Sequence, residues 1–239
     1  MPFFAPLRLW LTALFAVWIA GAAQAQERGA DIVPDHRYLF VRDVDFFGAD
    51  LTNLFDTTQA ACERACSAQS ACAAFTFNTR SNACFPKAAV ADQQPYAGAM
   101  SARKVATDAE VLAQVPDRRA ALGFLSQADI QNAANLVRSN NRRFSFDGEG
   151  LADLTAALEQ AGRNGDVTSA LGWAGKAVAL SDAAALWQRY AELSLARAVA
   201  VKGRDRRNAN RTALSAAVNA ALRTPAAAQP AAAAEVLAR

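Results

Sequence analysis

Four cysteines are the residues of this chain with the clearest capacity for chemistry. They are Cys62, Cys66, Cys72 and Cys84, and their spacing is C-x3-C-x5-C-x11-C. In an oxidising compartment, an even and clustered set of cysteines predicts disulfide bonds. A zinc site is the alternative, but zinc ligands usually pair as C-x2-C, and redox catalysis needs the same pair at a helix start. Neither half of the set has that spacing. The pattern therefore favours two disulfides, with three possible pairings.

Other catalytic constellations are missing from the sequence. The single histidine, His36, excludes histidine-rich metal centres and follows a stretch that we expect to be flexible, so we expect a solvated side chain. The run from Asp43 to Gly48 begins like a calcium loop, but Phe47 and Leu54 occupy ligand positions. No phosphate-binding glycine loop and no nucleophile elbow occur. We therefore expect neither an enzyme nor a bound metal or cofactor.

Composition describes a globular chain with balanced charge. Hydrophobic residues make up 53% and charged residues 20%, and 25 Lys+Arg against 22 Asp+Glu give a formal net charge of +3. This balance argues against nucleic acid as a partner. One basic cluster is formed by Arg204, Arg206, Arg207 and Arg211. We expect it to be a solvated loop running from Lys202 to Asn210; binding to an anionic surface is the alternative.

The first 25 residues have the pattern of a signal peptide. Arg8 precedes an apolar run from Leu9 to Ala20, and small residues then occupy the positions that a signal peptidase reads. Cleavage is expected between Ala25 and Gln26, followed by a linker over 26–35; an uncleaved membrane anchor is the alternative. The apolar run is shorter than the roughly 20 residues of a bilayer span. We therefore expect an exported chain, periplasmic or extracellular, with no membrane span after signal removal.

The segment around the cysteines predicts a small aromatic sheet with one helix. The runs 38–41, 74–78 and 82–86 are rich in strand-forming residues, with a turn over 78–81. Residues 56–58 can cap a helix that ends near Gln69. Cys62 and Cys66 lie four residues apart on that helix and therefore share one face. This pattern describes a helix held by two bridges on a sheet.

These residues resemble a PAN/apple domain over residues 36–105. The resemblance is carried by Phe46-Phe47-Gly48, the run from Cys72 to Asn78 with its F-T-F-N strand, and Cys84-Phe85-Pro86-Lys87. It implies the pairing Cys62–Cys84 and Cys66–Cys72. It also implies that the module binds protein or glycan.

The remaining residues, 107–239, predict an all-α region, so the fold class is α+β. Helix starts are expected at 107–110 and at 126–129, a loop at 142–148, and further helices from Leu151, Asp166 and a cap at 181–182. The small residues at 165–177, with Trp187 about one 34-residue period after Leu151, resemble degenerate tetratricopeptide repeats. A generic alanine-rich helical bundle is the alternative.

The order of the parts resembles the N-terminal region of bacterial alpha-2-macroglobulin-like protease inhibitors. The bait segment, macroglobulin domains and thioester of such proteins are missing, and the last residues, 234–239, read as the start of another repeat in a truncated chain. The resemblance implies a non-catalytic binding and positioning module whose protein partners are proteases or envelope proteins, with glycan also possible. The alternatives are a free-standing periplasmic PAN protein that binds protein or glycan and, least favoured, an enzyme.

Overall fold

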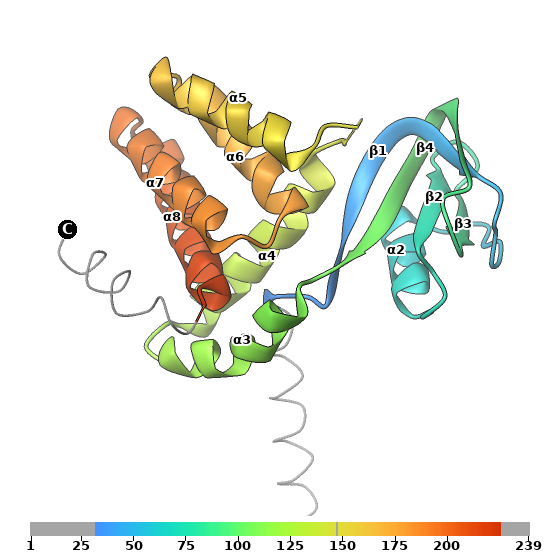
Figure 1. Cartoon of the computed structure of the whole chain (residues 1–239), viewed down its shortest axis with the longest axis horizontal. Helices are drawn as coiled ribbons and strands as arrows, with labels where there is room; N and C mark the ends of the chain where they lie inside the picture. The colour runs from blue at the N-terminus through green and yellow to red at the C-terminus, as the bar shows by residue number, and fades with distance from the viewer. Residues whose placement is uncertain (1–31, 147, 226–239) are drawn as a thin grey trace, which may run out of the picture.

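The fold is that of an α+β protein, as the sequence predicted (Figure 1). A computed structural model describes residues 32–146 and 148–225. A twisted sheet with one short helix lies at one end, and the remaining helices pack together at the other. We call residues 36–106 the sheet unit and residues 109–223 the helical unit.

The sheet unit contains four antiparallel strands in the order β1-β4-β2-β3. They are β1 (His36–Phe47), β2 (Ala74–Asn78), β3 (Ala83–Lys87) and β4 (Asp92–Ala106). The three predicted strand runs fall within β1, β2 and, apart from Asn82, β3. Strand β4, whose first half is polar and exposed, was not predicted from the sequence. This strand pairs with both β1 and β2, so it joins the halves of the sheet.

Helix α2 (Gln59–Ser67) lies against the sheet, as the cysteine spacing predicted. The Thr58 hydroxyl accepts a hydrogen bond from the amide of Ala61 and so caps the first turn. Cys62 and Cys66 are the buried residues of α2. They join the aromatic core of the sheet unit, in which Tyr38 packs edge-on against Phe75 at 5.2 Å between ring centroids.

The helical unit contains six helices. They are α3 (Ala109–Ala121), α4 (Gln127–Arg143), α5 (Leu151–Arg163), α6 (Val167–Leu180), α7 (Ala184–Ala200) and α8 (Gly203–Arg223). The predicted starts of α3 and α4 are confirmed: Asp108 caps α3, and Ser126 forms a capping box with Asp129 at α4. The apolar faces of α4 to α8 form a core around Leu158, Ala174 and Trp187.

Two expectations for the helical unit were wrong. The basic stretch predicted as a loop over 202–210 is almost entirely helical, because α8 begins at Gly203, whose φ of +59° allows the chain to turn directly out of α7. Its basic first turns are exposed, so the helix extends into solvent before its apolar face reaches the core. The loop at 142–148 was predicted to begin at Arg142, but in the structure Arg142 and Arg143 still belong to α4.

The residues just before β1 pack into the helical unit. Ile32 and Val33 are only 1% and 2% exposed, and they contact a core that contains Ile130 of α4 and Leu222 of α8. These two residues fall in the stretch predicted as a linker over 26–35, which remains a prediction for its other residues. The chain therefore leaves the helical core at Val33, builds the sheet unit, and returns to the helices at α3.

Candidate functional site

Two disulfides hold α2 on the sheet. Cys62 pairs with Cys84 of β3, and Cys66 pairs with Cys72, with Cα–Cα distances of 5.4 and 5.3 Å. These are the pairs that the PAN resemblance implied. Because the bridges use all four cysteines of the chain, no thiolate remains for a zinc site or a thiol nucleophile. Among the described residues, no group of three or more His, Cys, Asp or Glu side chains is placed to hold a metal ion.

Asp43, the first residue of the run that resembles a calcium loop, has a structural role. It lies at a bulge in β1, where the pairing with β4 shifts register, and its φ of +56° is left-handed. Its carboxylate accepts a hydrogen bond from the amide of Gly98 at 2.8 Å. Asp43 therefore stabilises a bend in the sheet.

His36 is not the solvated side chain that the sequence led us to expect. It begins β1, its side chain is only 18% exposed, and its ring lies edge-on to Tyr38. Its Nδ1 lies 2.6 Å from a carboxylate oxygen of Asp35, and its Nε2 lies 3.0 Å from the Ser67 hydroxyl. The start of β1 thus brings together an aspartate, a histidine and a serine.

This Asp-His-Ser array differs from a catalytic triad in the direction of the serine proton. The Ser67 hydroxyl donates to the carbonyl of Glu63, one turn earlier in α2, at 2.8 Å. The Tyr38 hydroxyl lies 2.9 Å from the same serine oxygen. Burial raises the pKa of Tyr38 to about 12, against the opposing effect of the hydrogen bond with Ser67. A neutral hydroxyl network therefore ties β1 to the end of α2.

A cavity of about 180 Å³ lies at the junction between the sheet unit and α4, and we call it the junction cavity. Its polar lining comes from β1, α2 and α4 and includes His36, Tyr38, Ser67, Arg138, Asn141 and Arg142. The side of the cavity toward solvent carries an ion pair between Arg142 and Glu63, at 3.0 Å, with Arg142 about half exposed. Sequence reasoning missed this cavity, because its residues come from three separate segments of the chain, within 34–40, 63–67 and 134–142.

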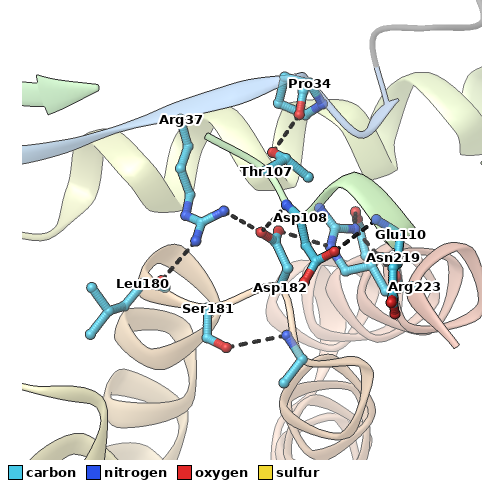
Figure 2. Close-up of polar contacts among 11 residues, drawn as sticks. Pro34, Arg37, Thr107, Asp108, Glu110, Leu180, Ser181, Asp182, Asn219 and Arg223 are labelled. Atoms are coloured by element: carbon cyan, nitrogen blue, oxygen red, sulfur yellow. Dashed lines mark hydrogen bonds and ion pairs between the residues drawn. The ribbon is translucent and has the colours of Figure 1, made fainter. Parts of the chain in front are cut away.

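A buried charge cluster joins the two units beside this cavity (Figure 2). Asp182, in the link between α6 and α7, accepts a hydrogen bond from Arg37 of β1 at 2.5 Å, and Arg37 also donates to the carbonyl of Leu180. Arg223 of α8 approaches the other carboxylate oxygen at 3.6 Å. Burial lowers the pKa of Arg223 to about 10, while Asp182 opposes this change.

This cluster corrects the prediction that residues 181–182 cap a helix. The N-cap of α7 is Ala183, which provides no side-chain cap, and the carboxylate of Asp182 faces Arg37 and Arg223 instead. The local pattern resembled a cap because Ser and Asp commonly occupy that position. The arginine partners are distant in sequence and gave no local signal.

Aromatic side chains are also exposed on the sheet unit. Phe47 is 58% exposed, Phe55 67% and Tyr96 48%. Phe47 ends β1, directly opposite Asp92 of β4, and Tyr96 follows on the same strand. Exposed aromatic rings beside carboxylates and amides are suited to contacts with another molecule.

The predicted cleavage position at Ala25 and Gln26 lies outside the described residues. Within the residues that are described, no helix is long and apolar enough to cross a membrane.

Comparison with protein families matches residues 44–93 to the PAN domain. No curated protein and no solved structure matches the chain significantly. The matched residues contain α2, β2, β3 and all four cysteines, together with the end of β1. The chain therefore carries a PAN domain at residues 44–93, followed by a helical region.

Proposed function

We propose that this chain is a non-catalytic binding and positioning module of an exported protein. The observation that carries the proposal is the PAN match over a sheet that is clamped by two disulfides. PAN domains are protein- or carbohydrate-binding modules. Disulfides form and persist in oxidising compartments, which supports a periplasmic or extracellular location.

The binding face that we assign to the PAN domain is the exposed aromatic set, Phe47, Phe55 and Tyr96. Large exposed aromatic rings are enriched at recognition surfaces because they contribute contact area with few rotatable bonds. Phe47 and Tyr96 lie on the antiparallel strands β1 and β4, so little backbone entropy is lost on binding at these two residues. The helical unit then holds the PAN domain in a fixed orientation through Arg37 and Asp182.

We further propose that this module serves an alpha-2-macroglobulin-like protease inhibitor. The support is the order of parts in the sequence, with a PAN domain followed by degenerate tetratricopeptide-like helices. In such a protein the module positions the inhibitory domains and does not trap proteases itself. Macroglobulin domains encoded after Arg239 in the same reading frame would support this assignment, whereas an immediate stop codon would favour the free-standing binding protein.

The test of the binding role is direct. The purified protein is applied to an array of defined oligosaccharides and, separately, to immobilised serine, cysteine, aspartic and metallo-endopeptidases. We expect binding on at least one surface, neither substrate cleavage nor slowed proteolysis, and loss of binding in the variants Phe47→Ser and Tyr96→Ser. Phe124→Ser is the matched control, because Phe124 is 80% exposed but belongs to the helical unit. Turnover of a substrate, or unchanged binding by both PAN variants, would contradict the proposal.

A further inference from the structure

The junction cavity has the position and size of a site for one small polar group. It lies between two packed units, where ligand sites are common, and its volume of about 180 Å³ is below the roughly 300–1,000 Å³ of drug-sized pockets. Val137 and Phe40 give it an apolar wall. A single sugar ring combines an apolar face with a hydroxyl-rich edge and is of this scale.

Asn141 is an unpartnered polar side chain that faces this space. The residue is only 8% exposed and lines the cavity, yet its amide makes no hydrogen bond to any residue in the described part of the chain. An amide that has no partner within the protein is free to form hydrogen bonds with a ligand that enters the cavity. Asn141 therefore presents one donor group and one acceptor toward the cavity.

The charges around the cavity favour an anion. Arg37 is paired with Asp182, and Arg142 is paired with Glu63. Arg138 makes no ion pair among the described residues, and only its Nη2 is in use, as a donor to Asn135 at 2.8 Å. Its Nε and Nη1 groups remain available to a carboxylate.

Hydroxyl groups line the remaining side of the cavity. The Ser67 hydroxyl is already engaged, since it donates to the carbonyl of Glu63 and its oxygen lies 2.9 Å from the Tyr38 hydroxyl and 3.0 Å from Nε2 of His36. The Tyr38 oxygen keeps lone pairs that can accept hydrogen bonds from a ligand. The pKa of Tyr38 is raised to about 12, so the phenol is neutral at physiological pH and adds no repelling charge.

From these contacts we propose that the junction cavity binds a hexuronic acid residue. The carboxylate pairs with Arg138, the ring hydroxyls bind Asn141 and Tyr38, and the apolar ring face packs on Val137. This site is separate from the proposed binding face, since neither Phe47 nor Tyr96 lines the cavity. Its failure would therefore leave the proposed function standing.

Sodium glucuronate is the probe, added to the purified protein and followed by calorimetry and by amide chemical shifts in NMR spectra. Glucose tests the ring without the carboxylate, and glutamate tests carboxylates without the ring. We expect saturable glucuronate binding with a Kd in the millimolar range, about −4 kcal/mol, as for a small ligand with few contacts. Shifts should concentrate on β1, the end of α2 and the second half of α4. Glucose and glutamate should each bind at least about tenfold more weakly, as expected when a charge-assisted pair or a set of hydroxyl contacts is lost.

Variants assign the contacts. Arg138→Gln and Asn141→Ala should each weaken glucuronate binding about tenfold, since each removes hydrogen bonds to the ligand. Arg163→Gln is the matched control, because Arg163 is 62% exposed and contacts Glu159 and Gln160 within its own helix. Equal binding of glucose or of glutamate, unchanged binding by Arg138→Gln, or the absence of saturable glucuronate binding would each overturn the inference. The comparison of the three ligands needs no variant, so a misfolded variant would not remove the test.

Discussion

Arg37 and Asp182 form a buried ion pair across the junction of the two units, although 145 residues separate them in the sequence. Both side chains are largely buried, at 9% and 15% exposed, and Arg223 completes the cluster from α8. Two guanidinium groups therefore share one carboxylate in a largely dry environment. The pair joins the sheet unit to the helices, and Asp182 contacts both arginines (Figure 2).

Replacing Asp182 should destabilise the whole chain. In Asp182→Asn the two arginines lose their shared counter-charge, and breaking a buried pair from one side costs roughly 3 kcal/mol or more. We expect a loss of this size in the free energy of unfolding measured with urea. Glu159→Gln is the control and should change stability by less than about 0.5 kcal/mol, since Glu159 is 71% exposed. Equal effects of the two variants would show that the cluster contributes nothing beyond a surface charge.

The residues before β1 should matter for the helices rather than for the PAN domain. Val33→Ser places a hydroxyl in the core formed with Leu222 and should lower the free energy of unfolding by about 2 kcal/mol. Amide hydrogen exchange should increase mainly in α3, α4 and α8. Val199→Ser is the matched control, because Val199 is 87% exposed. Faster exchange confined to the sheet would contradict the packing described above.

Removing the disulfides should affect mainly the sheet unit. The Cys62–Cys84 bridge spans 22 residues, and its loss should lower the free energy of unfolding by about 3 kcal/mol. The Cys66–Cys72 bridge spans 6 residues and should contribute about 2 kcal/mol. Because the aromatic core and the helical cores are separate clusters, we expect amide protection to fall in β1–β4 and to persist in α5–α7. Simultaneous loss of protection in both units would instead indicate one cooperative domain.

Tyr38 should make stability sensitive to alkaline pH. Its pKa is raised from 10.0 to about 12 by burial, so between these values the unfolded chain loses the phenolic proton while the folded chain keeps it. The unfolded state then binds fewer protons, and stability falls as the pH rises through this window. Tyr38→Phe removes this contribution, so the difference in free energy of unfolding between wild type and variant should shrink from pH 10 to pH 12. Parallel curves for the two proteins would contradict this assignment.

Much of the sheet unit was predictable because its signals are local. The cap at Thr58, the four-residue spacing of Cys62 and Cys66, and the aromatic run at Phe75 and Phe77 each act within a few residues. Such patterns report secondary structure and a shared face directly. Strand β4 was not predicted, because its first half is polar and exposed and therefore shows little alternation between apolar and polar residues.

The candidate sites were less predictable because they depend on contacts distant in sequence. The sequence predicted a solvated side chain for His36, but in the structure it lies beside Ser67, which is 31 residues away in the sequence. Asp182 read as a helix cap because its local context fits one, while its partners lie in β1 and α8. The basic start of α8 was predicted to be a loop, because solvent-exposed charged residues are compatible with both a loop and a helix. For His36 and Asp182, contacts with residues distant in sequence determine where the side chain lies.

The burial of Ile32 and Val33 has a consequence for the order in which the chain folds. The sheet unit is complete once Ala106, the partner of His36 at the end of the β1–β4 ladder, is present. The helical core instead joins Ile32 to Leu222 near the other end of the described chain. Contacts over such sequence separations form slowly, because a long loop must close first. As the chain emerges from its N-terminus, the disulfide-bonded sheet unit can therefore fold first, and the helical core, which includes Ile32 and Val33, forms last.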